Sequence, residues 1–194
     1  MKKKPTKQVI LDNAIALFKE KGYHQVKIEE ICAVSHITKS TFYYYFKAKD
    51  DLLEEFNHVA SAYAEETFNQ LLTSSNYVKQ LWNFYKISLT PTLNAGVEIT
   101  SQLLTINMEK DQHYFAPGEY SMWKTEILLI KKAQELNQIK NHEDAQKIAE
   151  ALVYAMEGTT LVWCIKKGNF DLTEKIKEAF ATILQIEEDF KNTF

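Results

Sequence analysis

The sequence predicts an all-α fold. Hydrophobic residues make up 45% of the chain and recur at the three- and four-residue spacing of a helix almost throughout. Only five glycines and three prolines interrupt 194 residues, and no segment alternates polar and apolar residues as a half-buried strand would. We therefore expect a series of helices joined by short turns.

Four helices are expected in the first 72 residues. Thr6, Thr38 and Asp50 are potential N-caps, because their side-chain oxygens can accept hydrogen bonds from the first free N–H groups of a helix. Gly22 can end the first helix in a left-handed conformation. The expected helices cover about residues 6–21, a short segment that carries Ile28 and Ile31, residues 38–46, and residues 50–72.

Five further helices are expected in the rest of the chain. Pro91 should end the first of them, because proline lacks an N–H and its ring clashes with the preceding helical turn. The polar segment 109–118 should form a loop, and Gly168 should separate the last two helices. The expected ranges are about 77–89, 95–108, 119–137, 142–167 and 172–191.

Charge is distributed unevenly along the chain. Residues 1–50 contain ten lysines and five acidic residues, whereas residues 51–194 contain thirteen lysines and twenty-one acidic residues. A basic head and an acidic body would orient the chain head-first on a polyanion such as nucleic acid. All twenty-three basic residues are lysine. The arginine–guanine contact is therefore excluded, and Lys, Ser, Thr and Tyr must substitute for it.

Composition also narrows the class of protein. The N-terminal lysines are not followed by the apolar segment of a signal peptide, and no apolar run reaches about 18 residues. We therefore expect a cytoplasmic protein without membrane contact. Cys32 and Cys164 are far apart in apolar helical patterns, which favours buried thiols over a metal site. The sequence lacks a phosphate-binding glycine loop, a metalloprotease motif and a cysteine cluster, so neither an enzyme nor a cofactor is expected.

Residues 28–46 fit a helix-turn-helix, which consists of two short helices joined by a tight turn. With Phe42 in the core, steps of about 100° per residue turn a set of polar side chains away from the core. The exposed set comprises Lys39, Ser40, Thr41, Tyr43 and Tyr44. Their hydroxyl and ammonium groups can bond base edges and phosphates in a major groove. The alternative is a solvent-facing surface that is polar by chance.

The turn, the second helix and the lysines after it form a specific pattern. It is carried by Ile37–Phe46, by Lys47–Asp50 with Leu52 and Leu53, and upstream by Ala14, Leu17, Phe18, Gly22 and Tyr23. This pattern resembles the signature of the TetR family of transcriptional repressors and covers about residues 6–53. The resemblance implies a three-helix DNA-binding domain over residues 1–50 and a larger helical domain over residues 51–194. The larger domain would bind an effector and dimerise, and a small molecule would relieve repression.

The resemblance also implies roles for individual residues on a near-palindromic double-stranded operator. It implies that Thr38 is the N-cap of the recognition helix and that Lys39, Ser40 and Thr41 enter the groove. It also implies that Tyr43, Tyr44 and Lys49 contact phosphates. Two positions depart from the family. His36 stands where the turn usually has glycine, and histidine adopts the left-handed conformation only at some cost. Lys27 replaces a capping threonine and would bind a phosphate instead.

The last two helices carry broad apolar faces that need partners. The same helices from two subunits could meet about a two-fold axis as a four-helix bundle, giving a homodimer. A purely intrachain core is the alternative. The residues predicted for dimerisation are Ile148, Leu152, Met156, Gly158, Thr159, Trp163, Ile176, Phe180, Ile183 and Leu184.

Large aromatic residues concentrate in the middle of the body. Individually such residues are usually core, but as a group they favour a cavity for a small, largely hydrophobic effector. The predicted effector-binding residues are Trp82, Tyr85, Gln102, His113, Tyr114, Phe115, Tyr120 and Trp123. The helix over residues 50–72 is the expected lever between effector and DNA. The alternative function is a DNA-bound adaptor whose body binds a protein partner.

Overall fold

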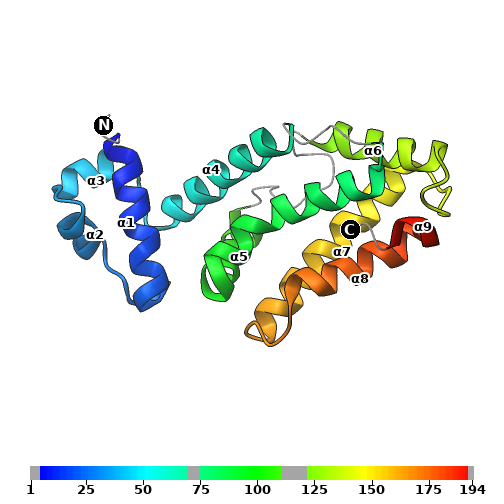
Figure 1. Ribbon diagram of the computed structural model, residues 1–194. Coiled ribbons are helices and arrows are strands. Elements are labelled where there is room, and N and C mark those ends of the chain that lie inside the picture. The colour runs from blue at the N-terminus through cyan, green and yellow to red at the C-terminus, as the bar shows by residue number, and fades with distance from the viewer. Residues whose placement is uncertain (1–4, 70–74, 111–121, 192–194) are drawn as a thin grey trace.

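The computed structural model describes residues 5–69, 75–110 and 122–191, and the side chains of all of these except 60–69. Within these ranges the ordered elements are helices, which confirms the predicted all-α fold. A single isolated antiparallel bridge joins Ile139 and Ile186 there. Figure 1 shows a small head formed by the first helices, a helix that leads away from it, and a larger helical body.

The head consists of three α-helices and one 3₁₀ turn. Their bounds are α1 Thr6–Lys21, η1 Tyr23–Gln25, α2 Ile28–Val34 and α3 Lys39–Tyr45. All three helices lie where the apolar spacing predicts them, although Pro5, and not Thr6, occupies the N-cap position of α1. Gly22 ends α1 as predicted and has a positive φ of 88°, but its ψ of 142° lies outside the left-handed helical conformation that was predicted.

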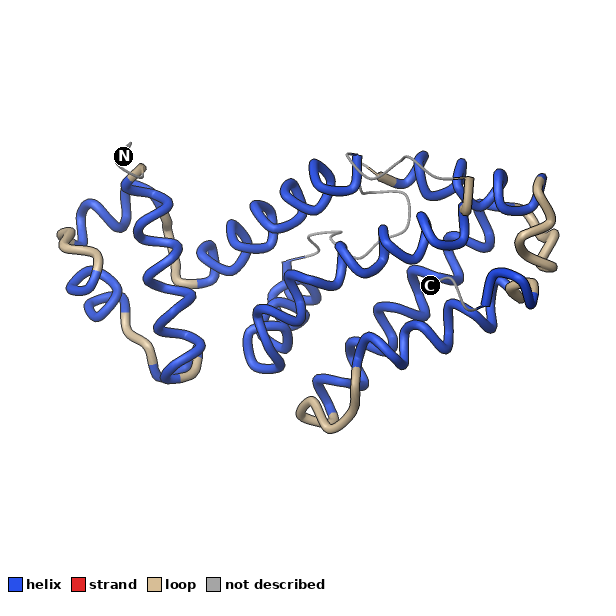
Figure 2. The backbone as a smooth tube through the Cα atoms, viewed as in Figure 1, coloured by secondary structure: helices blue, strands red, loops and turns tan. Residues whose placement is uncertain are grey.

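The remaining helices form the body, in which α7 packs extensively against α8 (Figures 1 and 2). Their bounds are α4 Asp50–Asn69, α5 Tyr77–Lys110, α6 Trp123–Glu135, α7 Ala145–Ile165, α8 Leu172–Leu184 and α9 Glu188–Lys191. Asp50, the expected N-cap of α4, is the first residue of the helix instead. The carboxylate of Asp51 accepts hydrogen bonds from the backbone N–H groups of Lys47 at 2.7 Å and Ala48 at 3.2 Å, so it holds the segment before the helix and does not cap the helix itself.

Two helix ends differ from the predictions. Pro91 does not end a helix, because α5 continues past it to a kink at Gly96, where φ is 79° and ψ is 174°. Leu89 and Ala95 are both buried, so packing holds the turns on either side of the proline, and the break falls where glycine permits a positive φ. The last long helix ends at Leu184 rather than near residue 191, because Gln185 adopts the left-handed conformation.

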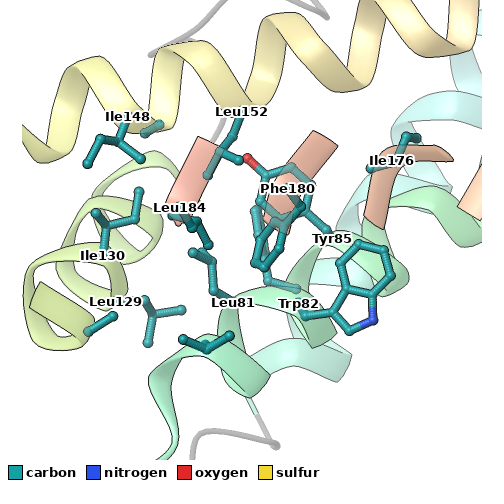
Figure 3. Packing of buried hydrophobic residues seen from close by; sticks show 14 of the residues in the cluster. Leu81, Trp82, Tyr85, Leu129, Ile130, Ile148, Leu152, Ile176, Phe180 and Leu184 are labelled. Carbon is teal, nitrogen blue, oxygen red and sulfur yellow. The ribbon is translucent and has the colours of Figure 1, made fainter. Parts of the chain in front are cut away.

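Two hydrophobic clusters organise the chain. The body cluster lies among α5, α6, α7 and α8, and Figure 3 shows Leu81, Tyr85 and Phe180 at its centre. The head cluster is built mainly from α1, α2, α3 and the start of α4. It also includes Ala95, Ile99 and Ile106 of α5. The second half of α5 is therefore packed into the core of the head, although it lies far from the head in sequence.

Helix α7 is apolar around most of its circumference. Among the described residues it is the one helix long and apolar enough to cross a membrane by length and composition, which the sequence was not expected to contain. A core helix meets the same test, and one side of α7, including Ala149 and Leu152, is buried in the body cluster. The exposed side needs a separate explanation.

Gly22 lies at a close contact between head and body. The backbone N–H of the next residue, Tyr23, donates a 2.6 Å hydrogen bond to Oε1 of Glu98 on α5. A Cβ on Gly22 would lie 2.7 Å from that same oxygen. The absence of a side chain at position 22 therefore allows this contact, in addition to permitting the positive φ.

We expect Gly22→Ala to lower the free energy of unfolding by more than Gly96→Ala does. Both substitutions strain a positive φ, at about 1–3 kcal/mol each, but a Cβ on Gly96 would meet no described atom within 4 Å beyond its chain neighbours and the backbone of its own helix. Urea unfolding measures both, and the combined Gly22→Ala and Glu98→Ala variant should lose less than the sum of the two single losses, because the clash and the hydrogen bond share one oxygen. Equal losses for the two glycine variants would show that a Cβ at position 22 does not displace Glu98.

Candidate functional site

The helix-turn-helix forms as the sequence predicts. Phe42 and Phe46 are buried in the head core, which fixes the opposite side of α3 toward solvent. Tyr43 is 52% exposed and Tyr44 is 80% exposed, so both rings stand on the outer surface of the head. His36 in the turn has a φ of 53°, which confirms that histidine takes the left-handed conformation at the glycine position.

Three hydroxyl groups gather at the N-terminus of α3. Thr38 caps the helix as predicted, because its Oγ1 accepts a hydrogen bond from the backbone N–H of Thr41 at 3.2 Å. The same oxygen lies 2.8 Å from the Ser40 hydroxyl and 2.9 Å from the Thr41 hydroxyl. Ser40 is exposed, so its hydroxyl can exchange this partner for a base edge or a phosphate.

Lys39 is paired with a carboxylate of the neighbouring helix. Its Nζ lies 2.5 Å from Oε1 of Glu29, and both side chains are more than half exposed. This bond lowers the pKa of Glu29 and raises that of Lys39. Because the pair is exposed, it contributes little to stability, and a phosphate can replace the carboxylate.

The start of α2 keeps half of a capping box despite the loss of threonine. Lys27 cannot cap with its side chain, but its backbone N–H donates a 3.0 Å hydrogen bond to Oε2 of Glu30. The other oxygen of Glu30 accepts from Nζ of Lys21 at 2.7 Å. The Lys27 side chain is exposed, so its ammonium can reach a ligand outside the head.

Lys49 is turned toward the inside of the head. Its ammonium donates to the backbone carbonyls of Tyr23 at 2.7 Å and Val26 at 3.1 Å, and lies 4.0 Å from the centre of the Tyr23 ring. Burial lowers the pKa of Lys49. The Tyr23 hydroxyl donates to the carboxylate of Asp50, and burial with this bond raises the pKa of Tyr23. Lys49 thus holds the turn after α1 in place.

Glu98 was not predicted from the sequence, although it contacts the same turn. It lies 75 residues from Tyr23, to which it is bonded. A single glutamate on an amphipathic helix gives no signal of a partner so distant in sequence. The one indirect signal is Gly22, whose lack of a side chain leaves room for another group.

The predicted effector residues are only partly brought together. Trp82 and Tyr85 are both buried, with ring centres 5.4 Å and 5.6 Å from that of Phe180. The Tyr85 hydroxyl donates to the buried carboxylate of Glu126. Trp123 packs on the edge of this cluster. Gln102 is half-buried on α5, and His113, Tyr114, Phe115 and Tyr120 lie outside the described residues.

Most of the predicted dimerisation residues are instead core residues of the single chain. The buried ones are Ile148, Leu152, Trp163, Ile176, Phe180 and Leu184. Figure 3 shows all of these except Trp163 converging with residues of α5 and α6. In the single chain, α7 and α8 use these faces to pack on the rest of the body, as in the alternative of an intrachain core. Met156, Thr159 and Ile183 are half-buried, and Gly158 is exposed.

The exposed side of α7 presents a second apolar surface. It comprises Tyr154, Leu161, Val162 and Ile165, which are 62%, 44%, 46% and 67% exposed. Gly158 lies in the same stripe, and a Cβ there would meet no described atom within 4 Å beyond its chain neighbours and the backbone of its own helix. We call this set, with Gly158, the outer face of α7.

Comparison with known proteins shows that the head matches the model of a protein family. Residues 10–56 match the model of bacterial regulatory proteins of the tetR family. IcaR of Staphylococcus aureus, a negative transcriptional regulator of a biofilm operon, is 33% identical over 79 residues. This match covers 40% of the chain and 42% of IcaR, so the chain aligns with less than half the length of that relative.

Solved structures extend the likeness to the whole fold. A transcriptional regulator from Saccharomonospora viridis in complex with choline has a TM-score of 0.70 at 22% identity, and the match covers 91% of this chain and 94% of that one. The repressor FadR of Thermus thermophilus in complex with lauroyl-CoA has a TM-score of 0.57 at 17% identity, with coverages of 92% and 93%. At this identity the likeness concerns the fold.

We expect Lys49→Ala to lower the free energy of unfolding by about 1–2 kcal/mol, because two carbonyls lose a charged donor and the Tyr23 ring loses its cation. Thermal and urea unfolding measure the change. Lys47→Ala is the matched control, since Lys47 is exposed and should change stability by less than about 0.5 kcal/mol.

The same variant tests the predicted phosphate contact of Lys49. A lost phosphate contact should reduce the slope of log affinity against log salt by about one. An unchanged slope, together with lower stability, would make Lys49 a residue that holds the head together and contacts no DNA.

Proposed function

Because its N-terminal domain belongs to the TetR family of bacterial regulatory proteins, we propose that this chain is a cytoplasmic transcriptional repressor. It binds a near-palindromic double-stranded operator as a homodimer, and a small, largely hydrophobic effector releases it. The observation that best supports DNA binding is the surface of α3, where three hydroxyls, a lysine and two exposed tyrosines lie opposite a buried face.

This surface has the chemistry that a DNA groove requires. Ser40, Thr41 and Lys39 occupy the first turn of α3, which is the part of a recognition helix that meets base edges. The exposed hydroxyls of Tyr43 and Tyr44 can donate to phosphates, and we propose that they do so. With lysine as the basic residue throughout, most of the affinity comes from phosphate contacts and depends strongly on salt.

The outer face of α7 supports dimerisation better than the residues first predicted for it. Tyr154, Gly158, Leu161 and Ile165 recur at intervals of three and four residues, so they form one stripe along the helix. Two copies of this stripe can pack about a two-fold axis, and Gly158 allows the helices to approach closely. A two-fold dimer would present both heads to the half-sites of a palindrome.

The proposal of an effector is supported by relatives of the same fold, which were solved with choline and with lauroyl-CoA. An effector acts on DNA binding only if it favours one position of the heads over another. The second half of α5 is better placed than α4 to transmit such a change. Val97 lies against Gly168 in the α7–α8 turn, while the adjacent Glu98 bonds to Tyr23 in the head. Gly96 immediately before them is the kink.

Selection from a pool of random duplexes should yield a near-palindromic site that wild-type protein binds as a dimer. Ser40→Ala should weaken binding to that site by roughly 3- to 10-fold, the value of about one hydrogen bond, and change binding to random DNA less. Thr105→Ala, an exposed hydroxyl on α5, is the control. Equal losses on selected and random DNA would contradict base recognition by Ser40, and the absence of any DNA binding would refute the proposed function.

Leu161→Asp should convert the dimer to monomers, because a charge would be buried against its own copy across the two-fold axis. Leu128→Asp is the control, since Leu128 is similarly exposed but lies on α6. Analytical ultracentrifugation measures both. A monomeric wild type would contradict the proposed dimer, and dimers that survive Leu161→Asp would place the interface elsewhere.

A further inference from the structure

Glu29 is an acidic residue on the surface that the proposed function places against DNA, and the sequence pattern predicted no role for it. It lies in the first turn of α2, next to Glu30. Glu30 has a structural role, because its oxygens accept from the backbone N–H of Lys27 and from Nζ of Lys21. The carboxylate of Glu29 points outward instead, with its side chain 58% exposed, and bonds to Lys39 of α3.

This ion pair joins α2 to the part of α3 that meets base edges. Lys39 is the first residue of α3 and directly precedes Ser40 and Thr41. Figure 1 shows α2 and α3 side by side at the end of the head that lies away from the body. The Glu29 oxygen lies 2.5 Å from the Lys39 ammonium, so a duplex that contacts the lysine also comes within reach of the carboxylate.

An acid at this position lowers the affinity for DNA in general. Phosphates repel the carboxylate and compete with it for the Lys39 ammonium. The pair contributes little to stability, because both side chains are more than half exposed, and Glu30 already supplies an acid to the dipole of α2. The bond lowers the pKa of Glu29 and raises that of Lys39, so both groups are charged at neutral pH. A fixed acceptor and a fixed donor therefore lie together on this surface.

Such a combination matches one kind of base pair in the major groove. A G·C pair presents N7 and O6 of guanine as two neighbouring acceptors, followed by the N4 amino donor of cytosine. One ammonium can donate to both guanine atoms while a carboxylate beside it accepts from N4. An A·T pair places its amino donor between two acceptors, so an ammonium beside a carboxylate reaches only one of them. Because the chain contains no arginine, lysine is the basic residue available for guanine.

We propose that Glu29 and Lys39 act as one unit that recognises a G·C base pair in each half-site of the operator. Lys39 donates to N7 and O6 of guanine, and Glu29 accepts from N4 of the paired cytosine. Both side chains are exposed, so they can move apart onto the two bases without disturbing the core of the head. This inference rests on the proposed function, in which the head binds DNA, and it names two residues that set the sequence preference.

The unit adds specificity more than affinity. On a G·C pair, the carboxylate exchanges the lysine for the amino group of cytosine, and the ammonium gains two acceptors. On any other pair the two groups cannot both be satisfied in this arrangement, and an unsatisfied carboxylate in the groove is unfavourable. Replacing the G·C pair therefore lowers affinity twice, through a lost contact and through repulsion.

A scan of the selected operator tests this recognition. Each base pair is replaced in turn in both half-sites, and fluorescence anisotropy measures binding by full-length wild type, Glu29→Gln, Lys39→Ala and Glu20→Gln. Glu20 is the matched control, because it is an exposed acid of the head on α1 and its substitution removes the same charge. We expect one G·C pair in each half-site at which A·T weakens wild-type binding by at least about tenfold.

Glu29→Gln and Lys39→Ala should each reduce this penalty to less than about threefold at that same base pair, and Glu20→Gln should retain it. Glutamine keeps the shape of glutamate but carries an amide that can also pair with adenine, which removes the preference for cytosine. Thermal unfolding of each variant shows that it is folded.

A penalty that survives Glu29→Gln would overturn the proposal. So would penalties that Glu29→Gln and Lys39→Ala relieve at different base pairs, because the two residues would then not act as one unit. An equal change by Glu29→Gln at every position and on random DNA would give Glu29 a structural role only. Operator binding without a sensitive G·C pair would refute this inference alone, whereas a wild type that binds no DNA would refute the proposed function.

Discussion

The arrangement of head and body depends on one turn, in which the backbone N–H of Tyr23 donates to Glu98. The carbonyl, the hydroxyl and the ring of Tyr23 also have partners. Its carbonyl accepts from Lys49, its hydroxyl donates to Asp50, and its ring packs edge-on against Phe18. The contacts come from α1, from the start of α4 and from α5, so the orientation of the head is determined where these three segments meet.

Because of these contacts, the second half of α5 packs against both the head and the body. Ile99 and Ile106 are buried in the head core, while Val97 lies against Gly168 in the body. The kink at Gly96 separates this segment from the first half of α5, whose residues belong to the body core. A rigid α4 alone would connect the two parts at one end only, whereas α4 and α5 together fix the angle between them.

Local patterns predicted the head well, and tertiary contacts explain what they missed. The cap at Thr38, the buried Phe42 and the left-handed His36 depend on residues within one or two helical turns. The contact of Glu98 depends on a fold that brings together residues 75 apart. Similarly, α7 is apolar on both sides, so spacing could not distinguish the inward-facing Ile148 from the outward-facing Ile165, and the predicted dimer surface included core residues.

The acidic residues inside the body differ in how they are satisfied. Glu126 is buried but accepts from Tyr85, so its position is explained by packing within the chain. Glu157 has a raised pKa and no partner among the described residues, so folding gains nothing from ionising it. A sequence under selection for stability alone would place an apolar or neutral residue there.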